Sequence, residues 1–273
     1  MDPYLRALCY RPSRVGVESA WYGHVPFGYW LVSETLPREI VELGVAHGAS
    51  YAAFCDGVVA SAGPARCHGV DTWGSATDDL VRGNIAYDGL ARFNDAHFAG
   101  FSTLLRMTFD EARTRFADGS VDLLHIDGHH TEDGVRHDFE GWLPKLSARG
   151  VVLIHATRPR HSRFGVWRFW EEARQRFPGF EFHHGEGLGV LAVGDDAPEA
   201  VRRLCTADAA AQAETRRVFA ALGERWSLAH DLGRAEDRVI HQSKLAEDLL
   251  HVARRTRDRL QALGYIIEDQ QAT

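Results

Sequence analysis

The chain alternates short apolar runs with longer segments of helical periodicity, and no other feature limits its fold as strongly. Crossover helices are expected between the first five strands, which should therefore run parallel in a doubly wound α/β order. The predicted strands are Glu39–Val45, Arg66–Thr72, Ser102–Met107, Val121–Asp127, Val151–His155, Phe180–His184 and Leu188–Val193. The predicted helices are Ala49–Ala62, Asp79–Phe98, Phe109–Phe116, Thr131–Leu146 and Val166–Phe177.

The last two predicted strands lie too close together for a crossover helix. Only Gly185, Glu186 and Gly187 separate them, so they should form an antiparallel hairpin at one edge of the sheet. A seven-stranded, mostly parallel sheet that ends in such a hairpin resembles the Rossmann-like fold of class I methyltransferases. The dinucleotide-binding fold, in contrast, usually has a sheet that is parallel throughout.

Three regions are expected along the 273 residues. Residues 38–195 hold the sheet. Residues 1–37 are rich in aromatic side chains and should form either a helix packed on the sheet or a lid over its open edge. Residues 196–273 turn helical after Pro198, which suits the first turn of a helix.

Residues 236–263 predict a long amphipathic helix. Its apolar stripe either pairs with a second copy of the chain, which would make a homo-oligomer, or docks on its own domain. The stripe consists of Leu245, Leu249, Val252, Thr256, Leu260 and Leu263.

Composition excludes several classes of partner. The 31 basic and 38 acidic residues give a net charge of -7 without a basic block, so no nucleic-acid partner is expected. No export signal and no apolar run of membrane-spanning length is present, so we expect a cytoplasmic protein without membrane association. The four cysteines are scattered and predict neither a disulfide framework nor a zinc site.

The first strand ends in a loop that predicts a nucleoside-bearing ligand. Gly44 and Gly48 frame this loop before a helix starts, and glycine lets a ligand approach the backbone closely. The acidic Glu42 before the first glycine fits a cationic amino-acid group better than a pyrophosphate. We therefore expect S-adenosylmethionine (SAM) here and not NAD.

The ends of the next two strands offer further contacts to this ligand. Asp71, at the end of the second strand, is placed to accept hydrogen bonds from both ribose hydroxyls. Trp73 beside it either stacks on the adenine or caps the core. Thr108, after the third strand, either lines the adenine or forms a capping box with Glu111.

Polar residues also follow the fourth and fifth strands, where an open parallel sheet borders its ligand crevice. These are Asp127, His129 and His130 after the fourth strand, and His155 at the end of the fifth. A histidine at a helix N-terminus stays neutral near pH 7, so His129 or His130 is a candidate general base, and Asp127 a further catalytic residue.

Three sequence motifs, taken in their order along the chain, resemble a known family more specifically. Glu42-Leu43-Gly44, Ile126-Asp127-Gly128 and the segment from Asp138 through Trp142-Leu143-Pro144-Lys145-Leu146 to Gly150-Val151-Val152 are similar to bacterial methyltransferases of the macrocin O-methyltransferase type. The resemblance covers residues 38–195. It implies SAM-dependent methylation of a hydroxyl on a small sugar-like, glycan or natural-product substrate, with His130 the better match to the general base.

The same resemblance implies a divalent metal at Asp127 and at the residues after the fifth strand. A close subgroup has His-Asp there, whereas this chain has His155-Ala156, so one carboxylate is missing. Mg²⁺ prefers several oxygen ligands. Binding of Mg²⁺ or Mn²⁺ by Asp127 and His155 therefore stays open.

Two alternatives to methyl transfer remain at this point. The chain could bind SAM without transferring its methyl group and act as a binding or assembly module, as Ala156 and the long C-terminal helix suggest. It could also be a nicotinamide-dependent oxidoreductase, which the missing Gly-x-Gly-x-x-Gly motif disfavours.

Overall fold

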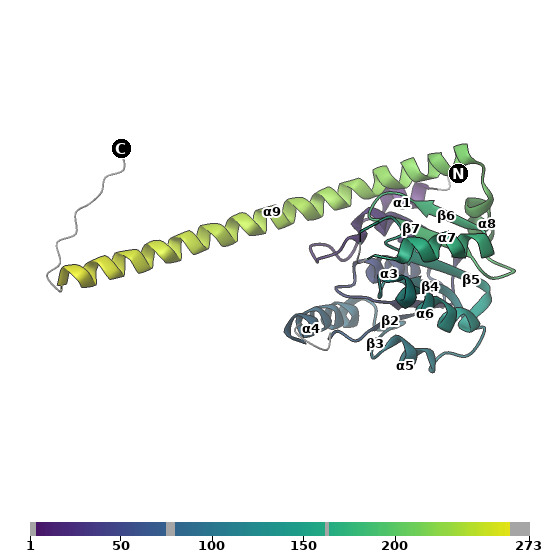
Figure 1. Ribbon diagram of the computed structural model, residues 1–273, viewed down its shortest axis with the longest axis horizontal. Coiled ribbons are helices and arrows are strands. Elements are labelled where there is room, and N and C mark those ends of the chain that lie inside the picture. The colour runs from purple at the N-terminus through teal and green to yellow at the C-terminus, as the bar shows by residue number, and fades with distance from the viewer. Residues whose placement is uncertain (1–3, 75–79, 162–163, 263–273) are drawn as a thin grey trace. The chain divides into compact units, whose positions relative to one another are not determined.

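A computed structural model describes residues 4–74, 80–161 and 164–262, and contains one seven-stranded sheet with the order β3-β2-β1-β4-β5-β7-β6 (Figure 1). The first five strands run parallel, and β7 pairs antiparallel with both β5 and β6. The predicted mostly parallel sheet with a terminal hairpin is confirmed. The strands are β1 (Glu39–Leu43), β2 (Arg66–Asp71), β3 (Ser102–Arg106), β4 (Val121–Ile126), β5 (Leu146–His155), β6 (Gly179–Phe182) and β7 (Leu188–Ala192).

The crossover helices lie close to their predicted positions. They are α3 (Ala49–Ser61), α4 (Leu80–His97), α5 (Phe109–Arg113), α6 (Glu132–Trp142) and α7 (Val166–Arg176). The helix α6 ends before Leu146 because Leu143–Lys145, which contains Pro144, forms a separate 3-10 turn, η2. Residue 79, the predicted start of α4, lies outside the described residues.

Both faces of the sheet are covered, and each face has its own apolar cluster. One cluster joins the sheet to α3, α4 and the N-terminal helix α2 (Val25–Thr35). The other joins it to α5, α6 and α7. Burial on both faces explains why the central strands β1 and β4 contain only buried residues.

The N-terminal region packs as a helix, the first of the two arrangements considered from the sequence. After α1 (Leu5–Cys9) and the 3-10 turn η1 (Trp21–His24), α2 lies against α3. Phe27 and Leu31 of α2 are fully buried.

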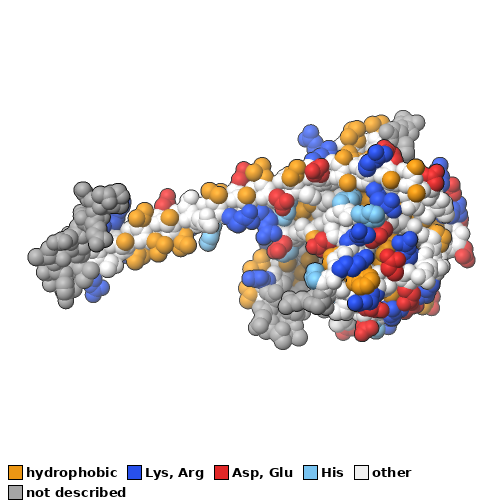
Figure 2. Space-filling model, turned by 45° about the horizontal axis from the view of Figure 1, so that its top comes forward, with side chains coloured by type: hydrophobic (Ala, Val, Ile, Leu, Met, Phe, Trp, Pro, Cys, Tyr) orange, Lys and Arg blue, Asp and Glu red, His pale blue; other side chains and the backbone are white. Residues whose placement is uncertain are grey.

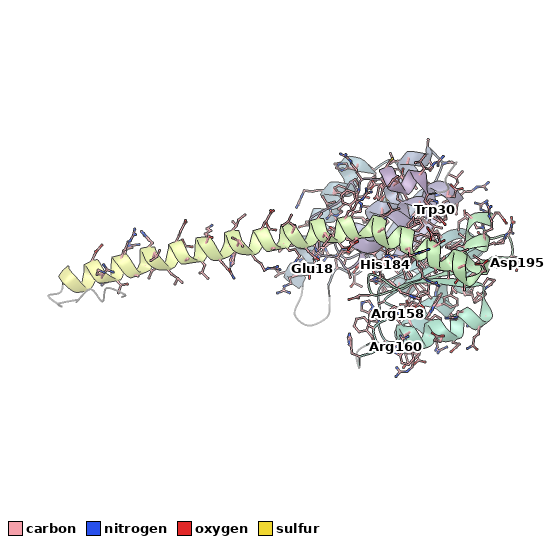
Figure 3. All side chains as sticks on the ribbon, turned by 90° about the horizontal axis from the view of Figure 1, so that it is seen from above. Glu18, Trp30, Arg158, Arg160, His184 and Asp195 are labelled. Carbon is pink, nitrogen blue, oxygen red and sulfur yellow. The ribbon has the colours of Figure 1, made fainter. Side chains whose placement is uncertain are left out.

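The chain divides into two compact units, residues 1–227 and 228–273. The first unit includes the N-terminal segment, the sheet with its helices, α8 (Glu199–Thr206) and the first turns of α9 (Ala209–Ala262). Figure 3 shows Trp30 of α2 beside these first turns, where its ring lies 5.6 Å from that of Phe219. Within the described ranges, no helix has the length and apolar character needed to cross a membrane.

We expect Phe182→Ala to lower the free energy of unfolding by about 3–5 kcal/mol, because it leaves a cavity between three elements. The Phe182 ring is fully buried and contacts the rings of Phe27 and Phe219 at 4.6 and 5.7 Å. Urea unfolding measures the change. The matched control Val59→Ala, at a residue 57% exposed, should change stability by less than about 0.5 kcal/mol. Equal effects of both substitutions would contradict this packing.

Candidate functional site

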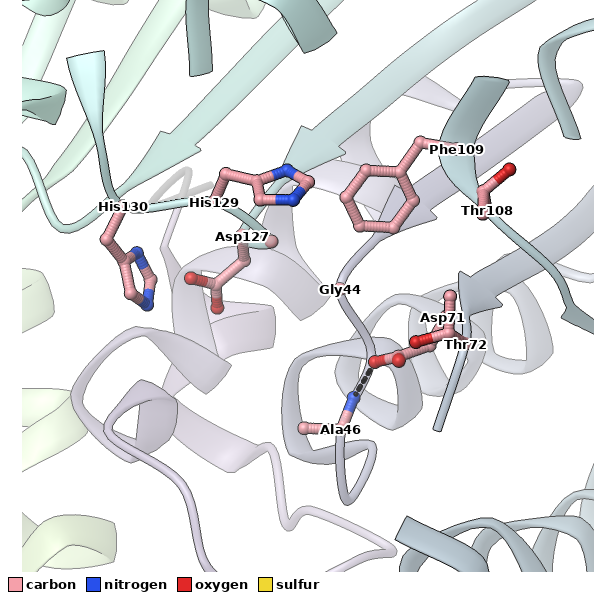
Figure 4. Close-up of a pocket in the computed structure, with 10 residues that line it drawn as sticks. Gly44, Ala46, Asp71, Thr72, Thr108, Phe109, Asp127, His129 and His130 are labelled. Atoms are coloured by element: carbon pink, nitrogen blue, oxygen red, sulfur yellow. Dashed lines mark hydrogen bonds between the residues drawn. The ribbon is translucent and has the colours of Figure 1, made fainter. Parts of the chain in front are cut away.

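The carboxyl ends of β1, β2 and β4 border a cavity of about 450 Å³ (Figure 4). This volume is within the range of small-molecule sites. The lining consists of Gly44, Ala46, Asp71, Thr72, Thr108, Phe109, Asp127, Gly128, His129 and His130. It thus includes six of the predicted site residues, which come from the ends of four different strands.

Gly44 keeps the floor of this cavity open. Its φ is +88°, and a Cβ atom there would lie 2.4 Å from the carbonyl oxygen of Asp127. The backbone of β1 can approach β4 this closely only with glycine. Gly48 also has positive φ and is the N-cap of α3, where it lines a second cavity described below.

Glu42 points behind the loop and lines neither cavity. Its side chain is fully buried, accepts a hydrogen bond from Ser50 Oγ, and lies 3.2 Å from Nδ1 of the buried His125. Burial raises the pKa of Glu42. The sequence pattern predicted a ligand contact for this carboxyl group, whereas the contacts it makes here hold the start of α3 against β1.

Asp71 lies on the cavity wall and also shapes the glycine loop. Its carboxylate accepts hydrogen bonds from the backbone N–H of Ala46 at 2.9 Å and of Trp73 at 2.8 Å. Trp73 is 3% exposed, donates from Nε1 to the Ala46 carbonyl and packs on Tyr87, so its indole is part of the core and does not line the cavity.

Thr108 and Phe109 form the wall opposite Asp71. Thr108 caps α5 in a capping box with Glu111, as one of the two sequence readings predicted, and still lines the cavity. The Phe109 ring meets His129 edge-on at 5.5 Å. This wall offers an apolar face and a hydroxyl group.

The buried His155 and the partly buried Asp127 form a pair across the ends of β4 and β5. His155 Nδ1 lies 2.9 Å from Asp127 Oδ1, and His155 Nε2 lies 3.0 Å from the carbonyl oxygen of Gly185. Both ring nitrogens face oxygen atoms that can accept hydrogen bonds, an arrangement that favours the doubly protonated, positively charged ring. Burial alone would raise the pKa of Asp127 and lower that of His155, but their mutual attraction outweighs it and shifts both in the opposite sense.

These contacts do not fit the metal site that the resemblance implied. A metal ligand needs a free nitrogen lone pair, and the hydrogen bonds of His155 occupy both nitrogens. Ala156 supplies no ligand atom. Within residues 4–74, 80–161 and 164–262, no three His, Cys, Asp or Glu side chains are grouped to hold a metal ion.

The two candidate bases differ in their surroundings. His129 Nδ1 lies 3.0 Å from Asp138 Oδ2, and the His129 side chain is 61% exposed. His130 is partly buried and its ring stacks on Phe164 at 4.8 Å. Burial lowers the pKa of His130, and the nearby Asp127 charge offsets only part of this effect. The His130 ring is therefore neutral at pH 7.

A second cavity of about 200 Å³ adjoins the first and shares Gly44, Ala46, Asp127 and His130 with it. The sequence analysis missed part of its lining. Glu18, Ser19 and Ala20 lie in an irregular N-terminal loop without a recognisable motif. Glu186 is in the hairpin turn, where the flanking glycines were a usable signal. The remaining lining residues are Val45, His47, Gly48, Ala49, Ser50 and His155.

Non-glycine residues with left-handed backbone gather around the two cavities. Four of the six such residues in the described ranges lie here, after β1, β2 and β5 and in the hairpin turn, with φ between 43° and 64°: Ala46, Trp73, Ala156 and Glu186. The other two, Leu36 and Ala62, are the C-caps of α2 and α3. Side chains disfavour this conformation, and such strain is commonly stored at functional sites. This edge of the sheet is therefore the candidate active site.

Residues 41–157 match the protein family described as "Methyltransferase domain". The matched segment contains every residue that lines the first cavity. In fold, the chain is similar to a putative caffeoyl-CoA O-methyltransferase from Staphylococcus aureus, with a TM-score of 0.50 and 16% identity over 65% of this chain and 85% of that one. Residues 41–157 thus resemble a methyltransferase domain, and the fold of the chain agrees with this likeness.

Two further proteins are similar to parts of this chain. A methyltransferase from Podospora anserina, PaMTH1, solved with S-adenosylhomocysteine (SAH), has a TM-score of 0.48 and 15% identity over 71% of this chain and 89% of that one. The uncharacterised protein y4gI of Sinorhizobium fredii (strain NBRC 101917 / NGR234) is 44% identical over 186 residues, 68% of this chain. The match covers 20% of y4gI, so the chain spans about a fifth of that relative.

We expect His155→Gln to lower the free energy of unfolding by about 3 kcal/mol, because it leaves the Asp127 carboxylate without its positively charged partner. The raised pKa of His155 adds stability below pH 6.5 that is lost as pH rises through the folded-state pKa. The lowered pKa of Asp127 adds stability above pH 3.8 that is lost on acidification. The difference from wild type should thus be largest between pH 3.8 and 6.5.

Denaturant unfolding across pH measures this difference. His137→Gln, which removes an exposed histidine paired with Asp110, is the control and should cost little at any pH. A His155→Gln effect that does not change above pH 6.5 would show that the pair is not ionic.

Proposed function

We propose that the protein is a SAM-dependent O-methyltransferase that acts on a hydroxyl of a small sugar-like or natural-product substrate, with His130 as general base. The observation that supports this most is the junction of the two cavities at Asp127 and His130. One cavity suits a nucleoside, and the other is smaller and lined by polar groups. A donor and an acceptor bound on either side would meet at these two residues.

The first cavity fits the nucleoside part of SAM. Asp71 keeps lone pairs on its carboxylate for the ribose hydroxyls, and Phe109 offers an apolar face to the adenine. Gly44, with no side chain, lets the ligand lie directly on the backbone of the loop. Bound SAM supplies an activated methyl group, so the protein has to align the acceptor and take up one proton.

His130 is better placed than His129 for that proton. Its ring lines both cavities, whereas His129 lines only the first. The lowered pKa of His130 keeps the ring neutral, so it can accept a proton at pH 7. Stacking on Phe164 holds the ring plane in place.

Asp127 has a different role because its pKa is lowered by the His155 imidazolium. A weakly basic carboxylate is a poor proton acceptor but a good hydrogen-bond acceptor. We propose that it orients the acceptor hydroxyl toward the methyl donor. Together with His130, it would align the hydroxyl oxygen and remove its proton.

Asp71→Asn should weaken SAM binding about tenfold, since the neutral amide loses one charge-assisted hydrogen bond to the ribose. Isothermal calorimetry measures the dissociation constant, and thermal unfolding checks that the loop stays folded. Asp88→Asn, which neutralises an exposed carboxylate on α4, is the matched control and should bind SAM like wild type. No binding of SAM by the folded wild-type chain would refute the proposed cofactor.

His130→Ala should lower kcat by about 100-fold or more, because the hydroxyl proton loses its acceptor. In wild type, the rate should fall on acidification with a pKa below 6.5, and this limb should disappear in the variant. The assay follows SAH formation against a panel of sugars and other hydroxylated compounds.

His129→Ala is the control for this experiment and should retain most activity. A larger loss of activity in His129→Ala than in His130→Ala would identify His129, which contacts Asp138, as the general base instead. SAM binding without turnover on any acceptor would favour the alternative, a SAM-binding module without methyl transfer.

A further inference from the structure

The described part of the second unit is a helix with exposed apolar side chains. It comprises Leu228–Ala262 of α9, and Figure 2 shows hydrophobic side chains along its length. The exposed fractions are 52–66% for Leu228, Leu232, Val239, Ile240, Leu245, Leu249, Leu250 and Val252. Exposed apolar rows of this length mark interaction surfaces.

Four of these exposed residues, Leu228, Leu232, Val239 and Leu249, lie on a register with the spacing of a coiled coil. From Leu228 to Thr256, small or apolar side chains recur after four and three residues in strict alternation, interrupted only by Gln242. The positions are Leu228, Leu232, Ala235, Val239, Gln242, Ala246, Leu249, Ala253 and Thr256. This register differs from the stripe predicted from the sequence, which began at Leu245, and shares Leu249 and Thr256 with it. The last residue of that stripe, Leu263, lies outside the described residues. A sustained heptad of this kind favours pairing with another helix along the whole seam.

The charges on this helix are divided along its length. Residues 228–248 carry five acidic and three basic residues, whereas residues 249–262 carry four arginines and one aspartate. Two such helices side by side in parallel would place like charges together at both ends. In antiparallel order, the acidic part of each helix lies beside the basic end of the other.

We propose that Leu228–Ala262 pairs with the same segment of a second copy in an antiparallel coiled coil. The heptad register, interrupted only at Gln242, forms the contact surface between the two helices. Its small residues Ala235, Ala246 and Ala253 let the helices approach closely. The division of charge sets the antiparallel direction. The partner helix is a second copy of this segment, because the segment itself contains both the acidic part and the basic part that complement each other.

Charge reversal in the full-length chain tests both the pairing and its direction. An acidic variant carries Arg254→Glu, Arg255→Glu and Arg259→Glu. A swapped variant adds Asp231→Lys, Glu236→Lys and Asp237→Lys to these. Sedimentation velocity over a concentration series at low salt measures the dimer dissociation constant, and circular dichroism checks the helix.

Wild type should dimerise, the acidic variant should dimerise at least tenfold more weakly, and the swapped variant should regain wild-type affinity. The control Leu249→Glu, in the seam, should be monomeric. A monomeric wild type would overturn the proposal and indicate that the row docks on its own domain or on another protein. A dimer unaffected by the acidic variant would overturn the antiparallel order.

Discussion

The contact between Asp127 and His155 fixes the geometry on which both cavities depend. Asp127 follows β4 and His155 ends β5, and the second ring nitrogen of His155 reaches the carbonyl of Gly185 in the β6–β7 turn. His24 of η1 contacts the same carbonyl at 3.0 Å. Three strand ends and the N-terminal region are thereby joined at one point. Since His155 is buried and Asp127 is mostly buried, their separation would leave a poorly solvated charge without a partner.

This pair also explains the His155-Ala156 sequence, where the resemblance implied an acidic ligand. Ala156 has a φ of 60°, and its N–H donates to the carbonyl of Gly187. Its backbone closes the hairpin turn against β5, and the imidazolium of His155 balances the charge of Asp127. The negative charge of Asp127 is thus balanced by another side chain of the site. In the proposed mechanism, proton transfer depends on His130, the neutral ring at the junction of the cavities.

Periodicity and turn length predicted the sheet because they are local properties of the chain. The five residues between β6 and β7 leave no room for a crossover helix, so these strands form a hairpin at the edge of the sheet. The glycine loop, Asp71 and the residues after β4 were predictable because parallel strands end at one edge. The direction in which a side chain points, in contrast, depends on residues that are distant in the sequence. Glu42 turns toward Ser50 and His125, and Trp73 toward Ala46, through contacts that only the folded sheet brings together. The two hydrogen bonds of His155 could not be predicted for the same reason, because Gly185 lies 30 residues away.

The central claim is that SAM lies across the ends of β1, β2 and β4 with its methyl group directed to Asp127 and His130. A crystal structure of the full chain with SAH measures this most directly. The account predicts ribose hydroxyls within hydrogen-bond distance of the Asp71 carboxylate, adenine against Phe109, and the sulfur atom at the junction of the two cavities. SAH bound elsewhere, or with its sulfur away from Asp127 and His130, would contradict it.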